Sequence, residues 1–187
     1  PADILKQHDA IDAAPHDGIR IFKGIECDIL EDGRLDYDDD ILATFDYVIV
    51  AIHASLNMDE ATMTRRIIAA MEHDATTILA HPTGRLLLER QAAHVDIDAV
   101  LTAALDLGVV IELNALPRRL DLDWRSLRKA QEMGVLVSIN TNAHSLSDLD
   151  QVALGVGIAR KAWLSADQVI NTWTVAALEE LFQRRRG

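Results

Sequence analysis

The chain has 187 residues, of which 49% are hydrophobic and 26% charged, and its formal net charge is −12. Its length suits one domain with a sizeable core, its composition is that of an ordinary globular protein, and its acidity argues against a broad basic surface for nucleic acid. The single Cys27 excludes an internal disulfide framework and no apolar run reaches transmembrane length, so we expect a cytoplasmic protein with no membrane partner.

The chain opens on Pro-Ala-Asp-Ile-Leu-Lys-Gln-His, which predicts a helix rather than a leading strand. Apolar, β-rich runs then predict five strands at residues 19–25, 47–52, 76–80, 109–113 and 135–139. Most of these runs are almost continuously hydrophobic, which is typical of parallel strands covered on both faces.

Helical patterns lie between the predicted strands. Met63, Ile67 and Met71 follow i, i+4 spacing, and two further helices over 97–107 and 124–133 stop at Gly108 and Gly134. Asp123 is the expected N-cap of the helix over 124–133, and the last helices are predicted over 147–161 and 174–184. The alternation predicts an α/β protein with a parallel sheet or barrel. Because five strands cannot close an eight-stranded barrel, the chain is either an open sheet or a barrel whose first strands are absent from this piece.

Polar residues follow the predicted strands where each one ends: Glu26, His53, His81, Asn114, and the pair Asn142 and His144. The carboxyl ends of parallel strands open on one face, so we expect Glu26 and the three histidines to lie together. Histidines and a carboxylate are suitable ligands for zinc, manganese or iron. The alternative for each histidine taken singly is an ordinary loop or core residue.

Two arginines follow these positions along the chain. Arg85 ends the run His81-Pro82-Thr83-Gly84-Arg85, and Arg119 lies in Pro117-Arg118-Arg119-Leu120-Asp121. A planar guanidinium can clamp a phosphate, so Arg85 and Arg119 are candidate phosphate-binding residues. The alternative for each is a surface ion pair with one of the 30 acidic residues.

Several common sites have no support in the sequence. The acidic stretch over 28–40 lacks the EF-hand spacing, and the chain has no P-loop, no Gly-x-Gly-x-x-Gly and no Gly-x-Ser-x-Gly. Nucleotide-driven and serine-hydrolase chemistry are therefore not indicated.

The motifs resemble those of the PHP (polymerase and histidinol phosphatase) domain, in the form found at the C-terminus of bacterial family X DNA polymerases. The resemblance covers essentially the whole chain. The runs that carry it are Gly-Ile-Glu-Cys-Asp-Ile-Leu at 24–30, His-Pro-Thr-Gly-Arg-Leu-Leu at 81–87, Glu-Leu-Asn-Ala at 112–115 and Asn-Thr-Asn-Ala-His-Ser at 140–145.

The resemblance implies a distorted (βα)7 barrel of TIM-like form, here lacking its first two strands. It also implies a cluster of up to three divalent ions, manganese or zinc, at the strand ends. By position, Glu26 would bridge metals, and His53, His81 and His144 would each bind one. Asn142 stands where the family has an aspartate ligand. The implied activity is metal-dependent phosphodiester hydrolysis, a manganese-favouring 3′→5′ exonuclease beside a DNA repair polymerase.

Two departures from the family pattern shape the expectation. The first two family motifs are not in this chain, so we expect residues 1–187 to be the C-terminal portion of a PHP domain, with those motifs and the polymerase domain upstream. Asn142 brings no negative charge, and a cluster of divalent ions needs carboxylates to neutralise it. This predicts an exonuclease that is weakened or lost.

Three hypotheses follow. The first is an active phosphoesterase domain of a repair polymerase that contacts DNA through the full-length protein. The second is a degenerate PHP module with a structural or DNA-positioning role, which Asn142 favours. The third is a stand-alone phosphatase of the histidinol-phosphatase type, which the polymerase-branch motifs argue against.

Overall fold

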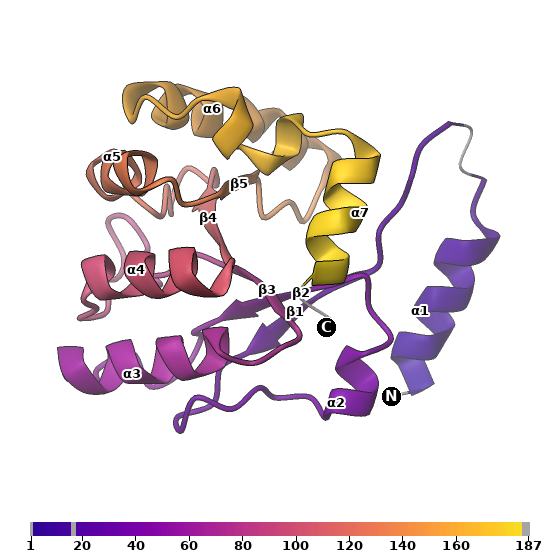
Figure 1. Ribbon diagram of the computed structural model, residues 1–187, viewed down its shortest axis with the longest axis horizontal. Helices are drawn as coiled ribbons and strands as arrows, with labels where there is room; N and C mark the ends of the chain where they lie inside the picture. The colour runs from indigo at the N-terminus through magenta and orange to yellow at the C-terminus, as the bar shows by residue number, and fades with distance from the viewer. Residues whose placement is uncertain (1, 16–17, 185–187) are drawn as a thin grey trace.

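The computed structural model describes residues 2–15 and 18–184, which form an α/β fold with alternating strands and helices (Figure 1). The strands are β1 (Gly24–Asp28), β2 (Tyr47–Ala51), β3 (Thr76–Leu79), β4 (Val110–Asn114) and β5 (Val137–Asn140). The α-helices are α1 (Ala2–Ala13), α2 (Asp39–Leu42), α3 (Glu60–Met71), α4 (Ile97–Leu107), α5 (Trp124–Met133), α6 (Val152–Lys161) and α7 (Val175–Arg184). The short 3-10 helices are η1 (Leu146–Gln151), η2 (Ala166–Gln168) and η3 (Ile170–Thr172).

The five strands form one parallel sheet in the order β1-β2-β3-β4-β5. Neighbours in sequence are therefore neighbours in space, as in the wall of a barrel, and all carboxyl ends share one edge. This confirms the predicted parallel α/β architecture. Within the described residues no pairing joins β1 to β5, so closure into a seven-stranded barrel stays a prediction.

Alternation along each strand divides the core into two layers. Val48 and Val50 of β2 belong to the larger cluster, which packs under α3, α4, α5 and α6 on one side of the sheet (Figure 1). Tyr47 and Ile49 belong to a second cluster, with Leu178 and Phe182 of α7. Because successive strand residues point to opposite faces, α7 covers the inner face, and α3, α4, α5 and α6 cover the outer face.

The first strand was predicted too early in the chain. It runs over Gly24–Asp28 and not over 19–25, so Glu26 lies inside β1 instead of following it. The apolar run before the strand has a different partner: the Phe22 ring packs against Phe182 of α7, with 5.2 Å between centroids. Ile19 in the same run is 70% exposed.

The predicted helices are largely confirmed. Asp123 caps α5 by accepting hydrogen bonds from the N–H groups of Arg125 and Ser126, and Gly108 and Gly134 end α4 and α5 in the left-handed conformation. The helix predicted over 147–161 is instead split into η1 and α6. Across residues 2–15 and 18–184, no helix is long and apolar enough to cross a membrane.

Candidate metal centre

Glu26, His53 and His81 meet near the carboxyl ends of three adjacent strands. Glu26 belongs to β1, His53 follows β2 and His81 follows β3. His53 Nε2 lies 3.2 Å from Glu26 Oε1, and His81 Nε2 lies 3.1 Å from the same oxygen. The two rings are in contact, with 5.2 Å between their centroids. The structure therefore brings together three residues that the sequence predicted to meet.

The two histidines differ in their surroundings. The side chain of His81 is only 2% exposed, whereas that of His53 is 38% exposed. The backbone N–H of His81 donates to the buried Glu112 carboxylate at 2.7 Å. The cluster thus has one ring fixed in the interior and one ring at the solvent boundary.

Electrostatic contacts within the cluster shift the pKa values of its two exposed groups, Glu26 and His53. Hydrogen bonds from His53 and His81 hold the pKa of Glu26 far below its usual range, against the opposing effect of burial. The hydrogen bond to Glu26 raises the pKa of His53, with a smaller contribution from Asp28. These shifts express mutual stabilisation of a carboxylate and a protonated ring in the metal-free chain.

The cluster fits a divalent cation. One ligand atom from each of the three residues lies within 4.8 Å of the others. Two imidazoles and one carboxylate form a known catalytic zinc set that leaves a coordination position for water or substrate. Within the described residues this is the group that meets the distance condition, so His144 does not join it.

Asn142 and His144 lie beyond β5. Asn142 has φ +50, and its carbonyl oxygen is 2.8 Å from Nδ1 of the exposed His144. The backbone N–H of His144 donates to Asp148, at the start of η1. The role of both residues as metal ligands stays a prediction, since the geometry does not add them to the three-residue cluster.

The two predicted phosphate-binding arginines have different environments. Arg85 Nε donates to the carbonyl of Arg119 at 2.9 Å, and its Nη2 donates to the carbonyl of Leu120. Within the described residues the buried Nε and Nη1 of Arg119 have no hydrogen-bond partner, and burial lowers the pKa of this guanidinium. Arg119 therefore has donors available for an anion, whereas Arg85 uses two of its own on the backbone that carries Arg119.

A cavity of about 940 Å³ opens on the inner face of the sheet. Its wall includes Glu26, Glu112 and Asn142, together with Ile170 and Phe182 from the segments that cover this face. The cavity therefore reaches Glu26 of the cluster, and its wall mixes polar residues such as Arg20 and Asn171 with apolar ones.

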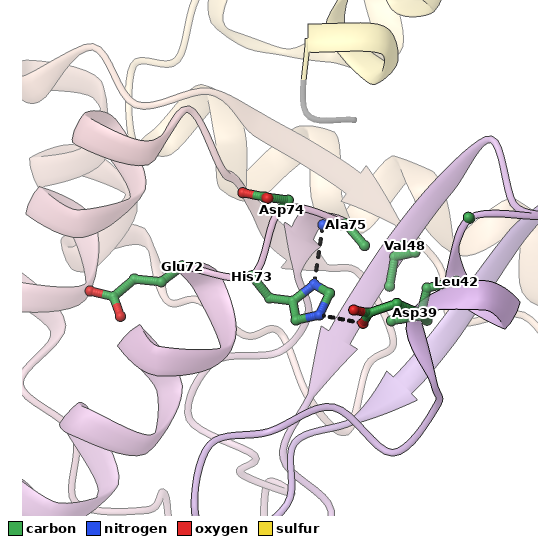
Figure 2. Close-up of a pocket in the computed structure, with 8 residues that line it drawn as sticks. Asp39, Leu42, Val48, Glu72, His73, Asp74 and Ala75 are labelled. Carbon is green, nitrogen blue, oxygen red and sulfur yellow. Dashed lines mark hydrogen bonds and ion pairs between the residues drawn. The ribbon is translucent and has the colours of Figure 1, made fainter. Parts of the chain in front are cut away.

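A second cavity, of about 580 Å³, lies near the amino ends of β2 and β3, at the end of the sheet opposite the cluster (Figure 2). His73 Nε2 is 3.1 Å from Asp39 Oδ1, and His73 Nδ1 accepts a hydrogen bond from the N–H of Ala75. Figure 2 shows the side chain of Glu72 directed away from this pair. The polar groups do not converge, so this cavity is a weaker candidate site.

Sequence reasoning missed two carboxylates that contact the cluster. Asp28 Oδ1 lies 2.5 Å from Nδ1 of His53, and Glu112 accepts the N–H of His81. A signal was present for each. Asp28 is two positions from Glu26 and thus on the same strand face, and Glu112 interrupts an apolar strand where a buried carboxylate needs partners.

The chain is similar to several named proteins. It is 43% identical to the DNA polymerase/3′-5′ exonuclease PolX of Bacillus subtilis, over 96% of this chain and 31% of that protein. It is 29% identical to a probable phosphatase of Thermoanaerobacter sp., over 91% of this chain and 71% of that protein. It is 28% identical to a probable phosphatase of Shewanella sp., over 90% of this chain and 68% of that protein. No family model matches the chain.

The fold and the cluster define an α/β protein with a two-histidine, one-carboxylate site at the carboxyl ends of parallel strands. The comparisons confirm the resemblance that the motifs indicated: the chain is a PHP-type domain related to the C-terminal part of the bacterial PolX. The chain spans about a third of the length of PolX.

Proposed function

We propose that this domain contains the metal-dependent phosphoesterase site of a family X DNA polymerase. The observation that carries the proposal is the meeting of His53 Nε2 and His81 Nε2 at one oxygen of Glu26. A divalent ion bound by these residues would polarise a phosphoryl oxygen and acidify a water molecule. Manganese and zinc both suit such ligands.

The residues of the chain have distinct roles in this proposal. Glu26, His53 and His81 hold the ion, with Glu26 supplying the negative charge. Arg119 binds the phosphate, because two of its buried nitrogens have no partner within the described residues. Arg85 is a weaker candidate for binding the phosphate, because two of its nitrogens donate to the carbonyls of Arg119 and Leu120. Arg85 is then a residue that positions the Arg119 loop.

The substrate we favour is the 3′ end of a DNA strand. PolX of Bacillus subtilis is named a DNA polymerase/3′-5′ exonuclease, and the similarity extends over 96% of this chain. In this proposal the full-length protein also has a polymerase domain upstream, acts in DNA repair and contacts DNA through both parts. The net charge of −12 favours DNA binding mainly outside this domain.

Two other functions each have one observation in their favour. Asn142 lines the same cavity as Glu26 but adds no charge, which favours a weakened site or a degenerate module with a structural or DNA-positioning role. Relatives named probable phosphatases match over about 70% of their length, which favours a small phosphomonoester substrate.

A comparison of substrates with the full-length protein tests the proposal. We expect manganese-dependent release of nucleotides from the 3′ end of a DNA strand, and little hydrolysis of a small phosphomonoester. His81→Ala should abolish the release, whereas His73→Ala, at the opposite end of the sheet, should leave it near the wild-type rate. Absence of release from the wild type would support the degenerate module, and preference for the monoester would support the phosphatase.

A further inference from the structure

The exposed ring of His53 lies between two carboxylates of a single strand. Glu26 and Asp28 are two positions apart on β1, so their side chains project from the same face. Asp28 pairs with Ala51 of β2 in the sheet register, and His53 follows shortly after that position. The sheet thus brings His53 over both carboxylates.

We propose that Asp28 is the positioning residue of the metal centre, holding Nδ1 of His53 so that Nε2 is directed toward Glu26. Asp28 Oδ1 lies 2.5 Å from His53 Nδ1, while His53 Nε2 lies 3.2 Å from Glu26 Oε1. A hydrogen bond at one imidazole nitrogen fixes which nitrogen keeps the proton and how the ring is turned. This inference rests on the proposed metal site and assigns a residue that does not itself bind the ion.

The need for such a residue follows from the exposure of His53. His81 is 2% exposed, and its backbone is held by Glu112, so packing fixes the position of its ring. His53 is 38% exposed and follows the end of a strand, so packing constrains its ring less. The contact with Asp28 supplies the constraint that burial gives to His81.

The chain contains a matched pair outside the metal centre. At the opposite end of the sheet, Asp39 Oδ1 lies 3.1 Å from Nε2 of His73 (Figure 2). This pair has the same chemistry, but neither residue belongs to the three-residue cluster. Asp39→Asn is therefore a control for the loss of an aspartate–histidine contact as such.

Isothermal titration calorimetry of the full-length protein with zinc tests the proposal. Asp28→Ala should weaken zinc binding by about tenfold to a hundredfold, the usual effect of removing a residue that orients a ligand. Asp28→Asn keeps an acceptor oxygen and should weaken binding less than Asp28→Ala. Asp39→Asn should stay within about twofold of the wild type, and His53→Ala should weaken binding at least as much as Asp28→Ala.

A second measurement does not depend on metal binding or on Asp28→Ala folding. Nitrogen-15 NMR of the metal-free chain, at a pH where His53 is neutral, should find the proton on Nδ1 in the wild type. Asp28→Asn should retain this tautomer in larger part than Asp28→Ala, which should give a mixture. Circular dichroism reports whether each variant is folded.

The outcomes separate this inference from the proposed function. Zinc binding by Asp28→Ala within twofold of the wild type, with a large loss in His53→Ala, would overturn the role of Asp28 and leave the metal site intact. No zinc binding by the folded wild type would overturn the metal site instead. In that case, a proton on Nε2 of His53 would overturn the Asp28 contact as well.

Discussion

The buried carboxylate of Glu112 accepts a hydrogen bond from the backbone N–H of His81, with 2.7 Å between Oε2 and the nitrogen. The same carboxylate accepts from the side-chain amides of Asn114 at 3.1 Å and Asn140 at 2.9 Å. These donors come from the ends of β3, β4 and β5. Glu112 therefore links three neighbouring strand ends and contacts the backbone of His81, a member of the three-residue cluster.

Replacing Glu112 with Gln should destabilise the fold, even though the two side chains have the same shape. Three donors converge on the carboxylate, and the new amide would direct its own N–H group at one of them. We expect a loss of about 1–3 kcal/mol in the free energy of unfolding, measured by urea denaturation. Glu132→Gln, which removes an exposed partner of Arg128, should cost no more than about 0.5 kcal/mol. Equal costs for the two variants would contradict a tying role for Glu112.

The site was predictable from the sequence where it depends on strand ends. Alternating strands and helices indicated a parallel sheet, and a parallel sheet brings His53 and His81 to one edge. The residues that hold these histidines were harder to foresee. The contact between Glu112 and His81 depends on the register of β4 against β3, which the local apolar pattern does not encode.

The error in the first strand has a related cause. An apolar run indicates that residues are buried but not which element covers them. Phe22 does not belong to the sheet. Its apolar ring is accounted for by packing against Phe182 of α7, far along the chain. The caps of α4 and α5 were predicted correctly because Gly108, Asp123 and Gly134 act through local backbone geometry.

The ionic contacts of the metal-free cluster predict a specific pH dependence. Glu26 is the main cause of the raised pKa of His53, so Glu26→Gln should lower that pKa in a proton NMR titration. Asp39 contacts the ring of His73, so Asp39→Asn should leave the titration of His53 unchanged. A His53 titration that is the same in Glu26→Gln and in the wild type would exclude the contact.

The same contacts predict a window of stability. A raised pKa of His53 contributes stability below its unfolded value of about 6.5, and that contribution is lost as the pH rises through the folded value. A lowered pKa of Glu26 contributes stability above its unfolded value of about 4.3, and that contribution is lost as the pH falls through the folded value. The difference in unfolding free energy between wild type and Glu26→Gln should therefore be largest between about pH 4.3 and 6.5.

Two glycines of α6 should respond in opposite ways to substitution by alanine. A Cβ atom at Gly155 would lie 2.5 Å from Ile139 Cγ2 and 2.9 Å from Ala115 Cβ, where α6 approaches the ends of β4 and β5. At Gly157 the added atom would meet nothing within 4 Å. Gly155→Ala should cost about 1–3 kcal/mol through overpacking.

Gly157→Ala is the matched control in the same helix. It should gain about 0.5–1 kcal/mol, because alanine restricts the unfolded chain and favours the helix. Thermal and urea unfolding of both variants give the comparison. A destabilised Gly157→Ala or an unchanged Gly155→Ala would contradict the close approach of α6 to the strand ends.

Restoring a carboxylate at position 142 tests the role of the missing charge. Asn142 lines the cavity that Glu26 also lines, and its backbone has φ +50, a conformation that aspartate tolerates nearly as well as asparagine. Asn142→Asp should therefore fold normally and add a negative charge beside the cluster. Because carboxylates neutralise bound cations, we expect tighter manganese binding and faster exonuclease turnover in the full-length protein.

The effect of Asn142→Asp must depend on the cluster itself. In a His81→Ala background the added carboxylate should bring back neither tight manganese binding nor turnover, because the buried ligand beside Glu26 is gone. Metal content, manganese titration and exonuclease rate are measured for the wild type, for each single variant and for the double variant. Unchanged metal binding in Asn142→Asp would mean that position 142 lies too far from the ions to act on them, so the asparagine would no longer be a reason to expect a weakened enzyme.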